Sequence, residues 1–295
     1  MVKVALIGCG AMGGAIGTRL AEVGADLTVF DLNPEAMARL VEKGAVAAAS
    51  AAEAARGKAF VITSLNSAAI VRAAVFGEGG VADGAATGTM IIDMSSIDPP
   101  STKALAKDAA AKGLAWVDAP LSGGAPKALI GELTVMAGGE ATHFESSKAV
   151  MSLLCKNYTH MGPSGAGQTT KLINQLLCGI GFMAVAEATR LAQDAGVDAA
   201  KVPVALKGGR ADSALLQEYM PRMATKDYTP TGRIANMVKD LNGVQDLARL
   251  TDTAMPLTAA CAEVHRLLTA AGLGDADQAA VMEFFEPRDT SGVPM

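Results

Sequence analysis

The sequence contains few of the residues that mark metal centres, disulfide frameworks or nucleic-acid surfaces. Its three histidines and four cysteines are scattered without metal-ligand spacing or a CxxC pair, so we expect no metal and reduced thiols. With 25 Lys and Arg against 30 Asp and Glu, the net charge of −5 disfavours nucleic acid or an anionic membrane as partner. Aromatic residues make up only 4%, so the core must be aliphatic, which favours helices and buried parallel strands.

Long uncharged apolar runs are also missing. The best candidate, 172–186, stops at Glu187, short of the roughly 18 residues that a membrane span needs. The apolar stretch before Cys9 is too short for a signal peptide. We therefore expect a cytoplasmic protein without a membrane segment. Its 295 residues, of which 50% are hydrophobic, are enough for two domains.

The N-terminus carries the first motif with chemical meaning. Residues 2–8 form a short apolar strand, residues 8–13 follow the pattern GxGxxG, and a helical pattern continues to Gly24. The first glycine permits a tight turn, the second lets a pyrophosphate approach the backbone, and the third lets the helix pack close to the strand. This unit predicts dinucleotide binding. The residues expected at the cofactor phosphates are Gly8, Gly10, Ala11, Met12 and Gly13.

A second predicted strand ends on Asp31. A carboxylate at this place can accept hydrogen bonds from an adenosine ribose and would repel a 2′-phosphate. No Lys or Arg lies between Asp31 and Arg39 to neutralise such a phosphate, so we expect NAD rather than NADP. Asn33, in the same loop, is included among the expected cofactor residues. The alternative is that Asp31 only caps the helix that begins near Pro34.

Strand and helix patterns alternate through residue 154, and after Met161 the pattern is helical as far as Phe285. This order predicts an α/β fold, with an N-terminal doubly wound Rossmann-type parallel sheet followed by an all-helical C-terminal domain. We expect an NAD-binding domain over 1–163 and an all-helical substrate and oligomerisation domain over 164–295. A long interdomain helix over about 167–193 should join them.

Ligands of a doubly wound sheet bind beyond the carboxyl ends of its strands, so the loops that follow the strands should share one crevice. Each of these loops could also be an ordinary turn. The loops contain Leu65, Asn66, Ser95, Ser96 and residues 119–124.

The last of these loops contains Ser122, Gly123 and Gly124 in succession. One hydroxyl and two glycine amides in one turn can form a small anion nest that suits a carboxylate. An ordinary Ser/Gly turn is the alternative.

The long helix places Lys171, Asn174, Gln175 and Cys178 on one face, at i, i+3, i+4 and i+7. Lys171 lies near the positive end of the helix dipole. The dipole and burial would both favour loss of its proton, which suits a proton-transfer group. A solvated lysine on an exposed face is the alternative.

Four ordered motifs resemble those of the β-hydroxyacid dehydrogenases, the family of 3-hydroxyisobutyrate dehydrogenase and tartronate semialdehyde reductase, over nearly the whole chain. Such a resemblance implies an oxidoreductase that transfers a hydride reversibly between NAD(P) and a short 3-hydroxy acid or its 3-oxo partner. The motifs are the GxGxxG turn at 8–13, Asp118–Gly124 continuing to Gly131–Gly139, Gly165–Gly167 with Lys171 and Asn174, and Lys239-Asp240-Leu241.

The resemblance also implies roles. Lys171 would transfer the proton and Asn174 would orient it and the substrate. The substrate carboxylate would bind at the 122–124 nest, and the expected substrate-binding residues are Ser122, Gly123, Gly124, Gln175 and Asp240. Lys239 would come from the helical domain beside the nicotinamide. The further cofactor contacts would be Leu65, Asn66 and Ser96.

Within the family, the chain looks most like the 2-hydroxy-3-oxopropionate (tartronate semialdehyde) reductases, with another β-hydroxyacid such as 3-hydroxyisobutyrate as the alternative. The segments behind this choice are 126–128, 174–175 and 257–260, whereas Leu121, Glu132, Val244 and Ala279 depart from the usual residues. Imine reductases and non-catalytic dinucleotide sensors are competing classes, but they usually lack the lysine that this chain keeps at 171. The family also implies a homodimer or homotetramer.

Overall fold

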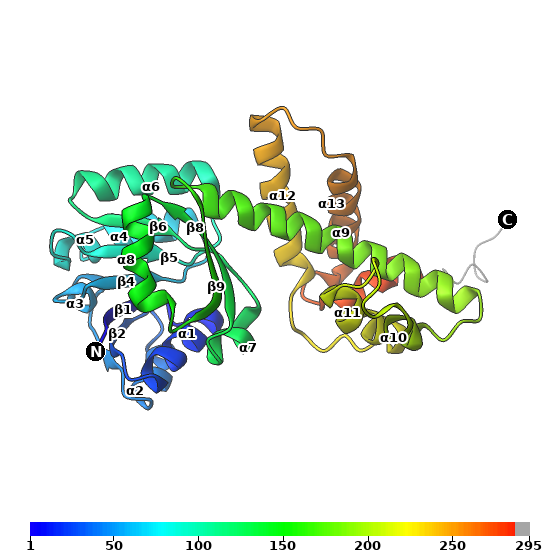
Figure 1. Cartoon of the computed structure of the whole chain (residues 1–295), viewed down its shortest axis with the longest axis horizontal. Helices are drawn as coiled ribbons and strands as arrows, with labels where there is room; N and C mark the ends of the chain where they lie inside the picture. The colour runs from blue at the N-terminus through cyan, green and yellow to red at the C-terminus, as the bar shows by residue number, and fades with distance from the viewer. Residues whose placement is uncertain (287–295) are drawn as a thin grey trace. The chain divides into compact units, whose positions relative to one another are not determined.

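The structure of the chain is a computed structural model that describes residues 1–286 (Figure 1). It divides into two compact units, Met1–Lys171 and Leu172–Met295. Among the described residues, every strand lies in the first unit, and the second unit is helical. Helix α9 (Ala166–Asp194) contributes to both units, and its bounds lie one residue beyond each end of the predicted helix.

The first unit is built on one sheet in the order β3-β2-β1-β4-β5-β6-β8-β7, with β9 paired to β8. Neighbours from β3 to β6 are parallel, β8 is antiparallel to β6 and β7, and β9 is parallel to β8. The predicted Rossmann-type fold is thus confirmed, with an antiparallel extension at one edge. The strands are β1 (Lys3–Ile7), β2 (Asp26–Phe30), β3 (Val46–Ala47), β4 (Phe60–Thr63), β5 (Met90–Asp93), β6 (Ala115–Asp118), β7 (Leu121–Ser122), β8 (Leu133–Gly139) and β9 (Cys155–Gly162).

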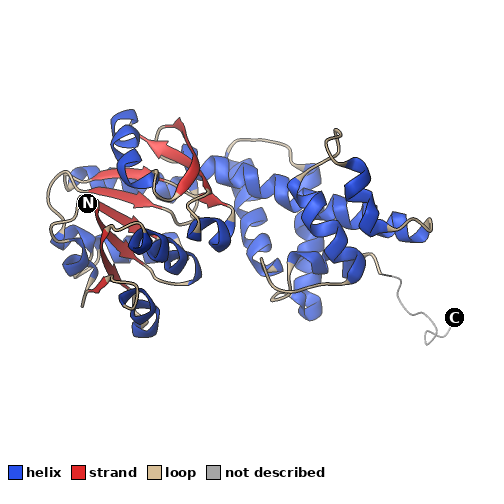
Figure 2. Cartoon of the chain, turned by 60° about the horizontal axis from the view of Figure 1, so that its bottom comes forward, coloured by secondary structure: helices blue, strands red, loops and turns tan. Residues whose placement is uncertain are grey.

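Helices cover both faces of the sheet, and Figure 2 shows the strands between them. The central strand β1 demonstrates the division, because Val4 and Leu6 join the core on one face while Ala5 and Ile7 join the core on the other. One face carries α1 (Ala11–Glu22), α2 (Pro34–Val41), α7 (Gly124–Leu129) and α8 (Ala141–Met151), and the other carries α3 (Ala51–Ala55), α4 (Ala68–Phe76), α5 (Val81–Gly84) and α6 (Pro99–Ala111).

Several short elements were not predicted: β3, β7, β9, α3, α5 and α7. Strand β9 (Cys155–Gly162) contains polar residues at exposed positions and lacks an apolar run. Helix α3 (Ala51–Ala55) is one turn long, and it begins where Ser50 Oγ accepts a hydrogen bond from the Glu53 amide at 3.1 Å. The other elements in this set, which are two to six residues long, bury too little apolar surface to leave a periodic pattern in the sequence.

The helical unit packs its own aliphatic core around α9. Phe182 and Val185 of α9 lie against Met220 of α11 and Leu241 of α12 in that core. Besides α9, the unit contains α10 (Val202–Leu206), α11 (Ala214–Thr225), α12 (Ile234–Leu250), α13 (Pro256–Leu268) and the short segments η1 (Ala199–Lys201), η2 (Thr269–Leu273) and η3 (Gln278–Phe284).

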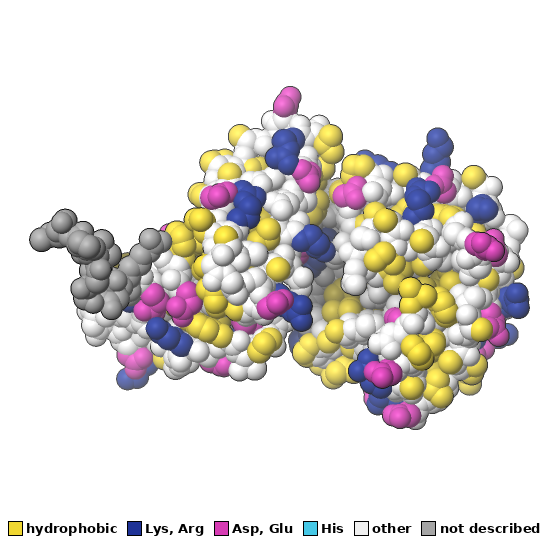
Figure 3. Space-filling model, turned by 180° about the vertical axis from the view of Figure 1, so that it is seen from behind, with side chains coloured by type: hydrophobic (Ala, Val, Ile, Leu, Met, Phe, Trp, Pro, Cys, Tyr) yellow, Lys and Arg dark blue, Asp and Glu magenta, His cyan; other side chains and the backbone are white. Residues whose placement is uncertain are grey.

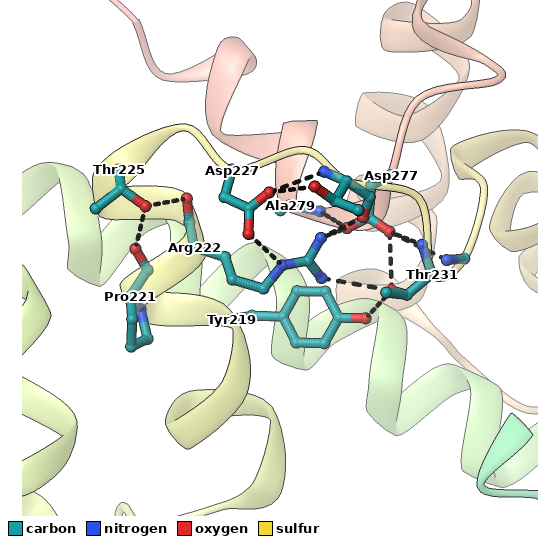
Figure 4. Close-up of polar contacts among 10 residues, drawn as sticks. Tyr219, Pro221, Arg222, Thr225, Asp227, Thr231, Asp277 and Ala279 are labelled. Carbon is teal, nitrogen blue, oxygen red and sulfur yellow. Dashed lines mark hydrogen bonds and ion pairs between the residues drawn. The ribbon is translucent and has the colours of Figure 1, made fainter. Parts of the chain in front are cut away.

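A buried carboxylate closes this unit (Figure 4). Asp277 Oδ2 accepts hydrogen bonds from the backbone amide and the hydroxyl of Thr231, at 2.6 and 2.8 Å. Its Oδ1 lies 3.1 Å from a guanidinium nitrogen of Arg222, and Tyr219 bonds to the Thr231 hydroxyl. Burial opposes ionisation of Asp277, but the backbone hydrogen bonds outweigh it and lower the pKa of this carboxyl. The network fastens the segment before α12 to the start of η3.

Helix α9 is long and apolar enough, by length and composition, to cross a membrane. The expectation concerned uncharged runs, and α9 contains Lys171 and Glu187, so the two statements do not conflict. A third of the most apolar window, 33%, is buried inside the protein, and a core helix of a soluble protein meets the same criteria, so the indication is weak. On the face shown in Figure 3, basic and acidic side chains are interspersed and neither sign forms a continuous patch.

Candidate active site

The glycine-rich turn between β1 and α1 has the geometry that its sequence predicts. Gly8 has a φ of +93°, in the left-handed region that favours glycine. A Cβ on Gly13 would lie only 1.9 Å from the carbonyl oxygen of Gly8, so this contact between helix and strand requires glycine. At Gly10, by contrast, a Cβ would meet no atom within 4 Å. This open space is what a phosphate needs in order to approach the backbone.

Asp31 is bound to this turn. Its Oδ2 accepts a hydrogen bond from the Cys9 amide at 2.6 Å, and its Oδ1 accepts one from the Asn33 amide at 2.8 Å. Asn33, not Asp31, caps α2, because its Oδ1 accepts from the Glu35 amide at 3.0 Å. The helix-cap alternative for Asp31 is thus wrong, and the carboxylate is held beside the glycine-rich turn.

A cavity of about 580 Å³ opens beyond the carboxyl ends of β1, β2 and β4. It brings together five residues that the sequence associates with a cofactor: Gly8, Gly10, Asp31, Leu65 and Asn66. Ala11, Met12 and Gly13 form the first turn of α1, and Ser96 lies in the loop after β5. The cavity is large enough for part of a dinucleotide, and its glycines and acid suit the pyrophosphate and ribose.

Buried polar groups connect the loops after β4 and β5. Asp93 Oδ1 accepts hydrogen bonds from the Thr63 hydroxyl at 2.8 Å and the Ser95 amide at 3.1 Å. Ser95 Oγ accepts in turn from the Leu65 amide at 3.0 Å. Asp93 Oδ2 is buried without a partner among residues 1–286. Burial raises the pKa of Asp93 to about 6, despite these hydrogen bonds.

Asp118, at the end of β6, holds the start of α9. Its Oδ1 accepts from the Gly165 amide at 2.8 Å and its Oδ2 from the Gln168 amide at 3.1 Å. Burial raises the pKa of Asp118, and the backbone hydrogen bonds oppose this rise. A Cβ on Gly167 would lie 2.5 Å from the Met136 carbonyl oxygen, so the helix start needs glycine to approach the sheet so closely.

Gln168 adds a second anchor. Its side chain is 1% exposed, its Oε1 accepts from the Ile97 amide at 3.2 Å, and its Nε2 donates to the Ser95 carbonyl at 2.8 Å. Lys171 follows one turn later on α9. Two buried side chains therefore fix the helix turn that precedes Lys171 to the carboxyl ends of β5 and β6.

The predicted nest lies between β7 and α7. Gly123 and Gly124 have consecutive positive φ values of +112° and +67°, conformations that strain residues with a Cβ. Ser122 ends β7, and Gly123 precedes the first turn of α7. The backbone conformation of this loop thus requires its glycines, and the loop is compatible with an anion nest.

In the helical unit, the structure brings together the predicted residues of α9 and α12. Asn174 Nδ2 donates to Gln175 Oε1 at 2.8 Å, and Gln175 Nε2 donates to Asp240 Oδ2 at 2.5 Å. Lys239 Nζ lies 3.4 Å from Asp240 Oδ1; its side chain is 57% exposed and that of Asp240 only 14%. Without the family resemblance, Lys239 and Asp240 would have looked like one exposed charged turn.

Sequence reasoning missed the anchoring roles of Asp93, Asp118 and Gln168. Gln168 follows Gly165 and Gly167 at the start of an apolar helix, and nothing in the local sequence indicates that its side chain is buried. Its burial at 1% exposure and its two backbone partners emerge only in the fold.

Residues 1–286 contain no group of three or more His, Cys, Asp or Glu side chains that could hold a metal ion. Burial raises the pKa of the Cys9 and Cys155 thiols to about 12, which disfavours the thiolate form at neutral pH.

Two protein-family models match the chain. Residues 3–162 match the model of the NAD-binding domain of 6-phosphogluconate dehydrogenase. Residues 165–285 match the model described as NAD-binding of NADP-dependent 3-hydroxyisobutyrate dehydrogenase. Together the two models span nearly all of the described residues, and the chain carries an NAD-binding domain of the dehydrogenase type.

Individual relatives agree over their whole length. A 2-hydroxy-3-oxopropionate reductase of Escherichia coli (strain K12) is 35% identical, covering 97% of both chains. An L-threonate dehydrogenase of Cupriavidus necator is 33% identical, covering 96% of both. The crystal structure of 3-hydroxyisobutyrate dehydrogenase from Salmonella typhimurium has a TM-score of 0.85 at 33% identity, covering 97% of this chain and 100% of that one. The chain therefore belongs to the β-hydroxyacid dehydrogenases, NAD(P)-dependent oxidoreductases that act on CH–OH groups.

Proposed function

We propose that the protein reversibly interconverts a short 3-hydroxy acid and its 3-oxo partner with NAD(H), and that tartronate semialdehyde is its preferred oxo substrate. One observation carries the assignment of the site. Asp118 and Gln168 fix the turn before Lys171 to the carboxyl ends of β5 and β6, the edge at which such sheets bind ligands. This anchoring supports a proton-transfer role for Lys171 over the alternative of a solvated surface lysine.

In this proposal, bound NAD supplies the acceptor or donor of the hydride, and the protein supplies binding and proton transfer. The Ser122 hydroxyl and the amides of Gly123 and Gly124 bind the substrate carboxylate. Lys171 gives a proton to the developing alkoxide in reduction and accepts the hydroxyl proton in oxidation. Asn174 orients these groups. The family resemblance supports Lys239, paired with Asp240, as a residue that would contact the cofactor.

The choice of substrate rests on likeness within the family. Residues 174–175 and 257–260 favour tartronate semialdehyde, and a relative named for 2-hydroxy-3-oxopropionate is 35% identical. Relatives of similar identity are named for L-threonate and for 3-hydroxyisobutyrate, so 3-hydroxyisobutyrate or another β-hydroxyacid is the alternative.

We also propose NAD over NADP, because Asp31 lies beside the glycine-rich turn and the next side chain, Leu32, is exposed and uncharged. We retain as proposals a cofactor domain over 1–163, a substrate and oligomerisation domain over 164–295, and a cytoplasmic location. A homodimer or homotetramer is supported by an apolar stripe on α9, where Ile173, Leu177 and Leu191 are 51%, 63% and 70% exposed.

The substrate assignment is tested with purified protein, by following NADH absorbance against a panel of oxo acids and the reverse reaction against hydroxy acids. The panel contains tartronate semialdehyde, methylmalonate semialdehyde, 3-hydroxyisobutyrate, L-threonate and L-serine, each with NAD(H) and NADP(H). We expect the highest kcat/KM with tartronate semialdehyde and NADH. A higher value for another acid would move the protein to that branch, and preference for NADPH would overturn the interpretation of Asp31.

A further inference from the structure

A chain of side-chain hydrogen bonds leads from α12 to α9 within the helical unit. Asp240 Oδ2 accepts from Gln175 Nε2 at 2.5 Å, and Gln175 Oε1 accepts from Asn174 Nδ2 at 2.8 Å. Asn174 Nδ2 also donates to Cys178 Sγ at 3.6 Å. At the other end, Asp240 Oδ1 faces the ammonium of Lys239 at 3.4 Å. A half-buried asparagine is thus connected through one glutamine to a carboxylate.

The carboxylate of Asp240 determines which atom donates and which accepts in each of these hydrogen bonds. An ionised carboxylate has acceptor oxygens and no donor, so Gln175 can meet Asp240 only with its Nε2 amide. The two ends of a side-chain amide point apart, so Oε1 of Gln175 must turn toward Asn174. Asn174 can then meet it only with Nδ2. The orientation of both amides therefore follows from the chemistry of Asp240.

We infer that Gln175 and Asp240 are positioning residues that make Asn174 present its carbonyl oxygen, Oδ1, to the reacting groups. Both hydrogens of Nδ2 are engaged, one by Gln175 and one by Cys178. Oδ1 can only accept a hydrogen bond, and the amine of Lys171, one turn earlier on α9, has N–H donors in either protonation state. An acceptor there fixes the rotation of the amine, so that its remaining proton or lone pair can face the substrate oxygen.

This inference rests on the proposed function, because it concerns the orientation of one group in that site. It gives Gln175 and Asp240 a role different from substrate contact. If they only bound substrate, exchanging acid and amide between the two positions would disrupt the site. If they set direction, the exchange should preserve it.

Asp240→Asn tests the direction. The ammonium of Lys239 faces Oδ1 of residue 240 and favours an oxygen at that place. An asparagine at 240 therefore keeps its oxygen toward Lys239 and turns its NH2 group toward Gln175. Gln175 then reverses, and Asn174 presents NH2 in place of Oδ1. We expect kcat to fall about tenfold or more, because a donor replaces the required acceptor. Gln175→Glu places two carboxylates together and should cause a similar loss.

The double variant Gln175→Glu/Asp240→Asn restores the direction. The new amide at 240 donates to the new carboxylate at 175, which accepts from Asn174 Nδ2 as Gln175 did. We expect kcat to return to within about threefold of wild type, a rescue that a merely structural defect would not give. Asp246→Asn is the matched control, since Asp246 lies on the same helix, is 67% exposed and pairs only with Arg249 in the part that the structure describes. Its kcat should stay within about twofold of wild type.

Neutron diffraction of the wild type, Asp240→Asn and the double variant supplies a readout without substrate. In the wild type and in the double variant, the deuterons on Asn174 Nδ2 should point toward residue 175. In Asp240→Asn, Asn174 Oδ1 should face residue 175 and the deuterons should point away from it. Unchanged kcat in Asp240→Asn, or a double variant no more active than the single one, would overturn the inference. If the wild type turns over no hydroxy acid, the proposed function fails. The deuteron positions would still show whether Asp240 and Gln175 orient Asn174.

Discussion

The two units hold their polar groups in different ways. In the sheet unit, Asp31, Asp93 and Asp118 lie beyond or at strand ends and accept hydrogen bonds mainly from backbone amides. In the helical unit, Asn174 and Asp240 are joined side chain to side chain through Gln175. Backbone donors are fixed by the fold, whereas side-chain donors must be fixed by one another. The partners of Asp118 and Asp240 lie 47 and 65 residues away along the chain, so neither arrangement is visible in the local sequence.

Two buried aspartates, one in each unit, differ in their energetic effect. Burial raises the pKa of Asp93 to about 6, and one of its oxygens has no partner among the described residues. Asp277 is equally inaccessible, but Arg222 and several backbone amides surround it, and its pKa is lowered. The buried Asp93 carboxylate therefore destabilises the folded sheet unit when it is ionised, whereas the buried Asp277 carboxylate stabilises the helical unit.

The largest effect is expected in the helical unit. Asp277→Ala removes the partner of Arg222 and the acceptor of the Thr231 and Gly232 amides. Loss of one member of a buried pair typically costs about 3–5 kcal/mol, so the free energy of unfolding should fall by that amount. Because its folded-state pKa is lowered, Asp277 stabilises the protein above its ordinary pKa and loses this contribution as pH falls. Urea unfolding at pH 7 and at pH 2, well below the ordinary 3.8, measures both effects, and an unchanged midpoint at pH 7 would refute this description.

A paired substitution separates packing from ligand approach in the glycine-rich turn. Gly13→Ala forces a Cβ against the Gly8 carbonyl and should cost about 1–3 kcal/mol of stability. Gly10→Ala meets no neighbouring atom, so it should leave the melting temperature nearly unchanged while weakening NADH binding. Thermal melting and NADH fluorescence titration measure the two effects. Equal stability losses in both variants would contradict the assigned roles.

Asp93→Asn should have the opposite sign to Asp277→Ala. A rise in pKa from the ordinary 3.8 to about 6 corresponds to about 3 kcal/mol against the ionised folded state. The amide itself lacks a partner, so we expect a net gain of about 1–2 kcal/mol at pH 8. The folded state binds the extra proton between these two pKa values, so the gain should shrink as pH falls through about 6 toward 4. Unfolding curves across this range decide it, and a gain independent of pH would exclude Asp93 as its source.

The smallest effect concerns cofactor choice. Asp31→Ser removes the carboxylate that would repel a 2′-phosphate and keeps a polar side chain beside the Cys9 amide. The ratio of kcat/KM for NAD to that for NADP should fall about tenfold, equivalent to about 1.4 kcal/mol. Kinetics with both cofactors provide the measurement. A ratio that stays the same would mean that another residue discriminates.

The sequence predicted the parts of this protein that depend on local rules. The GxGxxG turn, the alternation of β1, β2, β4, β5 and β6 with helices, and the long α9 follow from glycine geometry and hydrophobic period. The antiparallel β7–β8 edge did not follow, because β7 is only two residues long. The roles of Asp118 and Gln168 also escaped prediction, since their partners lie about 50 to 70 residues away along the chain. Side-chain burial and long-range pairing are properties of the fold and leave no local pattern.

The proton-transfer role of Lys171 is tested most directly by Lys171→Ala, assayed for turnover of tartronate semialdehyde with NADH and for NADH binding by fluorescence. General acid–base catalysis is typically worth about 10²–10⁴-fold, so kcat should fall by that factor while NADH affinity stays within about twofold of wild type. Turnover near the wild-type rate would contradict the role assigned to Lys171 and the mechanism built on it.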